Sequence, residues 1–273
     1  MNNEVRVINS IQITPNMQRV TLQGECLSAF SKNCAGNYIK LLFAENGSTD
    51  ISLVPQGQRP VMRTYTIRKH IPEENSIEVD FVRHDTEQGD HSYAAKWAKQ
   101  ASLGDKISLL GPGEIKDLNH DADWFFMVAD MTALPSLVTK IQRLPINATG
   151  YAVIQVIDKE DIQPLSTPEN IEVLWITASE SLADTVTSLP WKDGKVSVWS
   201  ACEFDTMREL RQYFRNEKNV EREFIYISSY WKNGVSEDGH KDIKRQDAAN
   251  IYKVLSTFVG HKWHRSINNG SKN

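Results

Sequence analysis

Cysteine and histidine are scarce in this chain of 273 residues. The three cysteines, Cys26, Cys34 and Cys202, are widely separated, and the seven histidines show no metal-ligand spacing. A disulfide framework, a structural zinc site or an iron–sulfur cluster needs more numerous and better placed ligands. We therefore expect no metal site, and any redox chemistry must use an organic cofactor or a partner's cluster.

The chain also lacks a run of about 18 apolar residues, so no membrane span is expected. Its first six residues lack the basic start and apolar stretch of a signal peptide, and we expect a cytoplasmic protein. No basic stripe is interleaved with aromatic residues, which argues against nucleic acid as a partner. Hydrophobic residues make up 40% and charged residues 24%, as is ordinary for a soluble globular protein.

The net charge of −4 is unevenly distributed. From Lys241 to the end there are seven Lys/Arg and two Asp/Glu, a balance of +5, which leaves −9 for the rest of the chain. One interpretation is a solvated basic tail. The other is a basic surface that attracts an anionic ligand or an acidic partner protein.

The first part of the sequence predicts short antiparallel strands. We expect them at residues 5–13, 19–23, 38–43, 63–68, 76–83 and 106–110, with one helix around 92–99. Alternation is clearest at 76–83, where Ile77, Val79 and Phe81 would share one face. Many short strands separated by turns favour an antiparallel barrel.

The pattern changes after residues 111–123, which look like a connection between domains. Continuous apolar runs then occur at 124–129, 151–157, 171–176, 196–199 and 224–227. Such runs are typical of parallel strands buried on both faces, and the helical periodicity between them indicates an α/β domain. We expect a barrel domain at 1–117, an α/β domain at 118–240 and a basic C-terminal extension at 241–273.

The segment 59–68, RPVMRTYTIR, carries side chains suited to a flavin. On a strand, Arg63 and Tyr65 point to one face, while Thr64 and Thr66 point to the other. An aromatic ring can stack on the isoalloxazine, a hydroxyl can bond the ring edge, and a guanidinium can pair with the pyrophosphate. The alternative is a solvent-facing strand whose arginines form surface ion pairs.

Arg63-Thr64-Tyr65-Thr66 resembles the R-x-Y-T flavin motif of ferredoxin reductase-type flavoproteins, and with Arg68 it has the R-x-Y-T-x-R form typical of the siderophore-interacting protein family. Further segments resemble the same family in the same order: residues 13–22, 80–84, 92–98, 132–135, 208–215 and 230–234. Each motif alone is weak, but the ordered set spans roughly residues 4–236. It identifies the chain as similar to this family.

The resemblance implies a six-stranded antiparallel FAD-binding barrel, followed by a C-terminal parallel-sheet, nucleotide-binding-like domain. It implies that Arg63, Tyr65 and Thr66 hold the isoalloxazine and the ribityl-phosphate. The other implied FAD contacts are Thr64, Arg68, Asp80, Phe81, Val82, His84, Ser92, Tyr93, Ala94, Trp97 and Thr132. The helix start near Ser92 would receive the pyrophosphate, because unpaired amides and the dipole at a helix N-terminus attract phosphate.

Three residues depart from the family pattern. Ala129, Cys202 and Ser229 stand where the family has glycine, at strand ends that would meet a nicotinamide cofactor. The first helix turn of the α/β domain also lacks a G-x-G-x-x-G fingerprint. We therefore keep two electron donors in view, NAD(P)H and a ferredoxin, with the basic tail as a docking candidate for the ferredoxin.

The activity implied by the resemblance is reduction of a ferric siderophore. Siderophores hold Fe(III) through hard oxygen donors and hold Fe(II) less tightly, so one electron is enough to release the metal. No catalytic residue is required beyond the flavin. Because many ferric siderophores are anionic, we expect contacts from cationic side chains. The candidates are Lys40, Lys232, Lys241, Lys244, Arg245 and Lys262.

Two other functions stay open. A general NAD(P)H-dependent flavin oxidoreductase would reduce quinones or dyes and leave ferric siderophores untouched. A flavin-free siderophore-binding protein would be colourless when purified, although the retained Arg63, Tyr65 and Thr66 argue against it. We expect the protein to be a monomer.

Overall fold

The computed structural model describes residues 3–83 and 93–249. The chain divides into two compact units, residues 1–230 and residues 231–273. The first unit contains a β-barrel and an α/β sheet. In the described part of the second unit, residues 237–249 form a helix.

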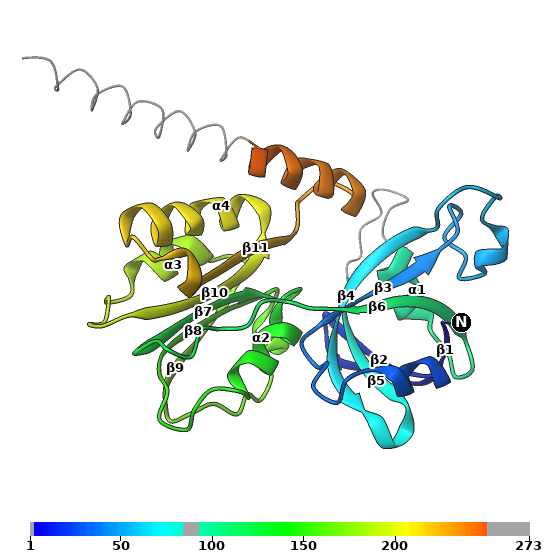
Figure 1. The fold of residues 1–273 in the computed structure, drawn as a ribbon, viewed down its shortest axis with the longest axis horizontal. Coiled ribbons are helices and arrows are strands. Elements are labelled where there is room, and N and C mark those ends of the chain that lie inside the picture. The colour runs from blue at the N-terminus through cyan, green and yellow to red at the C-terminus, as the bar shows by residue number, and fades with distance from the viewer. Residues whose placement is uncertain (1–2, 84–92, 250–273) are drawn as a thin grey trace, which may run out of the picture. The chain divides into compact units, whose positions relative to one another are not determined.

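Six antiparallel strands close the expected barrel, in the order β1-β2-β5-β4-β3-β6 (Figure 1). Their bounds are Glu4–Thr14 for β1, Met17–Gln23 for β2, Tyr38–Phe43 for β3, Val61–Ile71 for β4, Ser76–Val82 for β5 and Lys106–Gly113 for β6. Helix α1 (Tyr93–Gln100) contacts β2 and β5. Every predicted strand of this part is present, and β4 and β6 extend beyond their predicted ends.

The predicted inward face of β5 is confirmed. Ile77, Val79 and Phe81 are fully buried in the barrel core. On the other face, however, Asp80 and Val82 are also buried, at 7% and 8% exposure. Alternation weakens here because this outer face is covered by other parts of the chain rather than by water.

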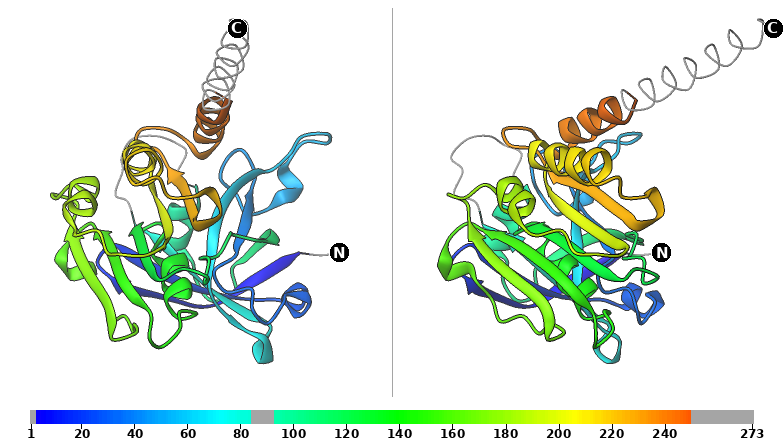
Figure 2. Two further views of the ribbon diagram at one scale, coloured as in Figure 1. Left: turned by 60° about the vertical axis from the view of Figure 1, so that its left-hand side comes forward. Right: turned by 90° about the vertical axis from the view of Figure 1, so that its left-hand side faces the viewer.

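The second part of unit 1 is a five-stranded sheet in the order β11-β10-β7-β8-β9. The strands are β7 (Trp124–Asp130), β8 (Thr149–Val156), β9 (Asn170–Thr177), β10 (Val196–Glu203) and β11 (Ile225–Trp231). The pairs β10–β7, β7–β8 and β8–β9 are parallel, as the continuous apolar runs predict. Helix α2 (Leu134–Ile141) lies on one face of the sheet, and α3 (Leu182–Ser188) and α4 (Phe204–Gln212) cover the other (Figure 2).

Helix α2 also packs against the barrel, next to the loop before β3. The Ser136 hydroxyl donates to the carbonyl of Gly36 at 3.5 Å. Gly36 has a φ of +87°, and a Cβ atom built on it would lie 2.3 Å from Oγ1 of Thr139. Both the backbone conformation and the close approach therefore require glycine at this position.

No helix of the described residues combines the length and the apolar character needed to span a membrane.

Candidate functional site

The two faces of β4 carry the motif side chains as the strand periodicity predicts. Arg63 and Ile67 pair with the barrel-core residues Leu41 and Val79, so Arg63, Tyr65 and Ile67 share the inner side. Thr64, Thr66 and Arg68 alternate with them on the outer side. Arg63 and Thr66 are buried, Tyr65 and Arg68 are half-buried and Thr64 is exposed.

Helix α1 brings aromatic rings to the inner side of this motif. The guanidinium of Arg63 lies 5.4 Å from the centre of the Tyr93 ring. Tyr65 packs against Phe81 with ring centres 4.3 Å apart, and Trp97 meets Phe81 edge-to-face with ring centres 5.8 Å apart. Phe81 is fully buried, so its side chain supports the half-buried ring of Tyr65. Five sequence-predicted residues are thus brought together.

A charged cluster covers the outer side of β2, β4 and β5. Arg19 binds Asp80 through two hydrogen bonds, Nε to Oδ1 at 2.6 Å and Nη2 to Oδ2 at 2.8 Å. Glu78 lies 3.6 Å from the same guanidinium. Nε of Arg68 lies 4.0 Å from Oδ2 of Asp80. The sequence does not single out Arg19. Its place on β2, a strand that pairs with the strand of Asp80, is the feature that could have indicated its role.

The pKa values of the two arginines move in opposite directions. The hydrogen bond to Asp80 raises the pKa of Arg19, whereas burial lowers the pKa of Arg68. The Arg68 guanidinium makes no hydrogen bond to the side chains that the structure describes, and its ion pair with Asp80 is long, at 4.0 Å, whereas Arg19 binds both oxygens of Asp80 at hydrogen-bond distance. A half-buried guanidinium with its donors unused is suited to an anionic group. The donor set therefore fits a phosphate or another anionic part of a flavin nucleotide.

Thr132 lies in a different part of the unit, in the turn between β7 and α2. Its amide and hydroxyl donate to Oδ1 of Asp130, at 2.9 and 2.6 Å. The next residue, Ala133, belongs to one buried cluster with Val82 and Met17 of the barrel. The turn that carries Thr132 thus adjoins the buried cluster that the sheet and the barrel share.

The three residues that replace family glycines lie at the carboxyl ends of β7, β10 and β11. Ala129, Cys202 and Ser229 are all at most 1% exposed. The strand order reverses between β7 and β10, and ligands of open α/β sheets bind at such a point. Close by, the Glu203 carboxylate accepts from the amides of Asp205 and Thr206 and thereby caps α4.

The cationic candidates fall into two groups. Lys40 pairs with Thr64 across β3 and β4, and its side chain lies on the outer side of the motif strand. Lys232, Lys241, Lys244 and Arg245 belong to the second unit. There Lys241 forms ion pairs with Glu237 and Asp238, both at 3.2 Å, and Arg245 forms one with Asp242 at 2.9 Å. His84, Ser92 and Lys262 lie outside the described residues.

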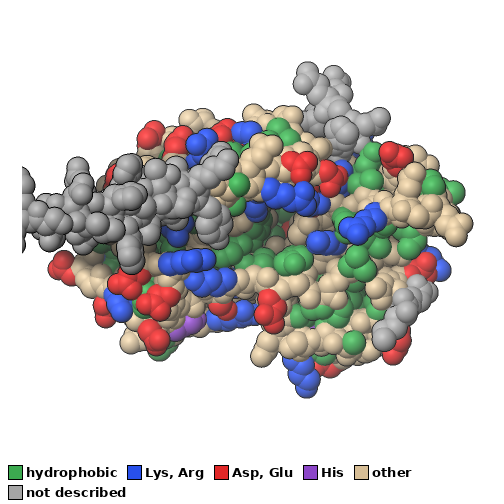
Figure 3. All heavy atoms as spheres, turned by 45° about the horizontal axis from the view of Figure 1, so that its top comes forward, with side chains coloured by type: hydrophobic (Ala, Val, Ile, Leu, Met, Phe, Trp, Pro, Cys, Tyr) green, Lys and Arg blue, Asp and Glu red, His purple; other side chains and the backbone are tan. Residues whose placement is uncertain are grey.

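Charges of both signs occur on the face drawn in Figure 3, where Lys and Arg side chains are interspersed with Asp and Glu. On this face, electrostatic attraction of an anionic substrate would therefore come from particular cations rather than from a surface of one sign.

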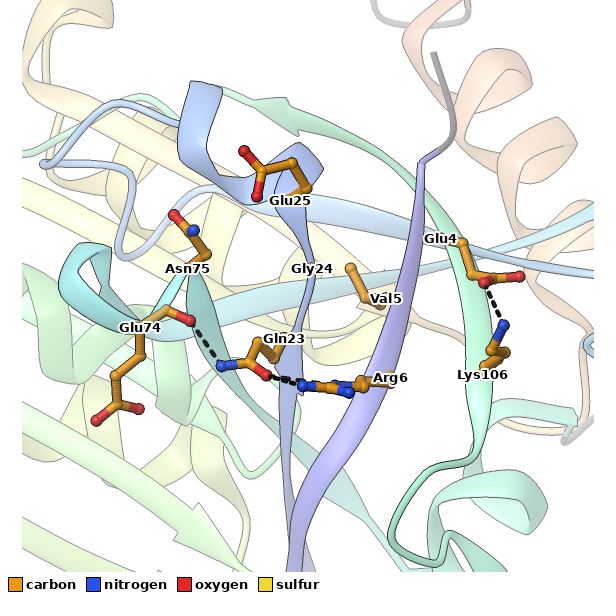
Figure 4. Close-up of a pocket in the computed structure, with 9 residues that line it drawn as sticks. All are labelled: Glu4, Val5, Arg6, Gln23, Gly24, Glu25, Glu74, Asn75 and Lys106. Atoms are coloured by element: carbon orange, nitrogen blue, oxygen red, sulfur yellow. Dashed lines mark hydrogen bonds and ion pairs between the residues drawn. The ribbon is translucent and has the colours of Figure 1, made fainter.

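A pocket of about 420 Å³ opens on the barrel between β1, β2 and β6 (Figure 4). Its two cationic side chains have partners inside the pocket: Arg6 donates to the amide oxygen of Gln23 at 2.8 Å, and Lys106 pairs with Glu4 at 2.9 Å. Gln23 is four residues from Arg19 along β2, which is about 13 Å of strand. The pocket is thus separate from the cluster around Asp80, and both of its cationic side chains already have partners.

The comparisons with known proteins match both parts of unit 1. A family model described as the siderophore-interacting FAD-binding domain matches residues 6–115, and one described as siderophore-interacting protein matches residues 122–234. The ferric vibriobactin reductase of Vibrio cholerae is 31% identical over 245 residues, which cover 84% of this chain and 89% of the relative.

Two other relatives agree. The NADPH-dependent ferric-chelate reductase of Escherichia coli is 23% identical, covering 84% of this chain and 92% of the relative. The crystal structure of the siderophore-interacting protein SipS from Aeromonas hydrophila aligns with a TM-score of 0.78 and 28% identity, covering 91% of this chain and 99% of that one. The chain therefore belongs to the siderophore-interacting protein family, with an FAD-binding barrel followed by an α/β domain.

Proposed function

We propose that this protein is an FAD-dependent oxidoreductase that reduces Fe(III) held in a siderophore and so releases the iron, acting as a monomer in the cytoplasm. The observation that carries the proposal is the arrangement on β4 and β5. A half-buried tyrosine is backed by aromatic rings on one side of β4, and a half-buried guanidinium has unused donors on the other. Two relatives, the ferric vibriobactin reductase and the NADPH-dependent ferric-chelate reductase, are ferric reductases.

The residues proposed to hold FAD divide by chemistry. Tyr65, supported by Phe81 and Trp97, offers a ring face for the isoalloxazine. Arg63 and Arg68 offer guanidinium groups to anionic parts of the cofactor, and Asp80 is bound at hydrogen-bond distance by Arg19 rather than by Arg68. Thr64, Thr66, Asp80, Val82, His84, Ser92, Tyr93, Ala94 and Thr132 complete the proposed set. When bound, FAD supplies the ability to accept two electrons and pass them on singly.

The substrate is proposed to be a ferric siderophore of negative charge. Among the candidate substrate-binding cations on the barrel, Lys40 lies beside the flavin motif, because it pairs with Thr64 across β3 and β4. Lys232, Lys241, Lys244, Arg245 and Lys262 are the further candidates. Holding the chelate beside the barrel keeps the electron transfer short, and reduction itself weakens the grip of the oxygen ligands on iron.

We propose two alternative electron donors, NAD(P)H and a ferredoxin. NAD(P)H is favoured by the sheet, whose strand order reverses between β7 and β10, and by a relative named for NADPH. A ferredoxin is favoured by Ala129, Cys202 and Ser229, whose side chains take space that glycine leaves to a ligand. The basic extension after residue 241 is the proposed docking segment in the second case.

The test is anaerobic stopped-flow absorbance of the purified protein, mixed in turn with NADH, NADPH and a reduced ferredoxin, and then with a ferric siderophore. A yellow protein whose flavin is bleached by a donor and reoxidised by the ferric siderophore supports the proposal. Arg68→Met should weaken FAD binding about tenfold or more, since a hydrogen bond to a charged group contributes about 1.5–3 kcal/mol. Arg6→Met, an exposed arginine of β1, is the matched control.

Other outcomes identify the alternatives. Reoxidation by quinones or dyes without reaction with ferric siderophores would mean a general flavin oxidoreductase. A protein that binds ferric siderophore and no flavin would be a carrier, and the central proposal would be wrong.

A further inference from the structure

A buried carboxylate joins the α/β sheet to the barrel. Asp161 lies in a 3₁₀ turn, Lys159–Asp161, that follows β8, and it is fully buried. Its Oδ1 accepts from the Thr14 hydroxyl at 2.7 Å and from the Asn16 amide at 2.9 Å. Its Oδ2 accepts from Nδ2 of Asn16 at 2.8 Å and from the Asp158 amide at 3.0 Å. Three of the four donors come from Thr14, the last residue of β1, and from Asn16 in the turn that leads to β2.

The negative charge of Asp161 is stabilised by hydrogen bonds from these neutral donors and not by a cationic side chain of the described residues. Among the ion pairs between described residues, none involves Asp161. Burial would raise the pKa of Asp161, but the hydrogen bonds from Asn16 and Thr14 outweigh it and hold the pKa below its ordinary value. The side chain is therefore ionised at neutral pH, and all four hydrogen bonds are charge-assisted.

The place of this contact suggests what it does. The same strand end carries Ile157, whose amide lies 3.3 Å from the sulfur of Met131, at the end of the neighbouring β7. Met131 packs in one buried cluster with Met17 and Val82 of the barrel. The carboxyl ends of β7 and β8 thus adjoin the turn between β1 and β2, and they share a buried cluster with the ends of β2 and β5, the strands that carry Arg19 and Asp80.

We propose that Asp161 is a positioning residue: it fixes the sheet to the β1–β2 turn, so that a donor at the carboxyl ends of the strands meets the flavin on the barrel. This inference rests on the proposed function. Asp161 itself touches neither the donor nor the flavin. Its effect is on the relative position of the two groups, and misplacement by about 1 Å can slow a reaction about 100-fold.

The first experiment compares Asp161→Asn with the wild-type holoprotein. The amide has the size of the carboxylate, but its NH₂ group would face N–H donors at one of the two oxygen positions. We expect flavin reduction by the donor to slow at least tenfold, while the dissociation constant of FAD stays within twofold. Asp184→Ala, an exposed carboxylate of α3, is the matched control. Asn16→Ala, which removes one of the four donors, should give a smaller effect of the same kind.

The second experiment measures the geometry directly. One spin label is attached at Ser28→Cys, in the 3₁₀ turn that follows β2, and the other at Thr187→Cys in α3, both in a Cys26→Ser background. Double electron–electron resonance then measures the distance between the barrel and the α/β sheet. Both labelled sites are exposed. The distance distribution should be narrow in the parent and broader in the Asp161→Asn protein.

The two proposals fail separately. A yellow Asp161→Asn protein with the parent's distance distribution and reduction rate would overturn the role of Asp161. Broadened distances in a protein that binds no FAD would support the link between sheet and barrel and refute the flavin proposal. An equal loss of FAD affinity and reduction rate would overturn the positioning role, because the variant would then act on the flavin site itself.

Discussion

The ion pair between Arg19 and Asp80 is the sharpest test of how the flavin site is built. The Asp80 side chain is 3% exposed, and Arg19 binds both of its oxygens. Replacing Arg19 by Met keeps most of the apolar stem and removes the charge. Removing one partner of a buried pair costs about 3–5 kcal/mol, because the other charge stays buried.

Part of this cost should be recovered by Arg68. Its Nε already lies 4.0 Å from Asp80 and can move onto the vacated carboxylate. We expect a net loss of about 2 kcal/mol, which corresponds to a fall of about 4–8 °C in melting temperature for a protein of this size. The movement also uses the donors of Arg68. FAD should therefore bind about 10- to 100-fold more weakly, the equivalent of about 1.5–3 kcal/mol for a hydrogen bond to a charged group.

The assay is urea denaturation of Arg19→Met, Asp80→Asn and the double variant, with FAD titration of each. The double variant should recover part of the stability, since neither Arg19 nor Asp80 is left as a lone buried charge, although Arg68 and Glu78 each lose a neighbour of opposite charge. Arg6→Met, whose side chain is exposed, should stay within about 0.5 kcal/mol of the wild type. The reasoning would be refuted if Arg19→Met were as stable as the wild type, or if FAD affinity did not change.

Three further outcomes are expected. Gly36→Ala should lower the free energy of unfolding by more than Gly57→Ala, because a Cβ on Gly36 meets Thr139 at 2.3 Å, whereas Gly57 has a similar φ of +85° and open space; denaturation curves compare them. The folded-state pKa of Asp161 is lowered, so its stabilisation is present above about pH 4 and is lost as the pH falls through the lower folded value. The stability gap between wild type and Asp161→Asn should therefore be largest near neutral pH and shrink in acid. Burial raises the pKa of Cys34 to about 11, so iodoacetamide at pH 8 should label it only after unfolding, as mass spectrometry would detect.

Much of the fold was predictable because its signals are local. The alternation of Ile77, Val79 and Phe81 marks a strand with one buried face, and the run at 124–129 marks a strand buried on both faces. Both patterns repeat within a few residues. The faces of Arg63 and Thr64 follow from the same periodicity, so the sequence also placed the flavin motif correctly along its strand.

The chain's own sequence therefore determined the barrel, the parallel sheet and the family. Only the tertiary structure decided which charges meet. Arg19 faces Asp80 because β2 and β5 pair in one register, and a shift of one residue would turn either side chain to the other face. Asp161 binds Thr14 across 147 residues of sequence. No periodic pattern carries such a contact, because it depends on how a barrel and a sheet pack together, and packing is a property of the whole folded unit.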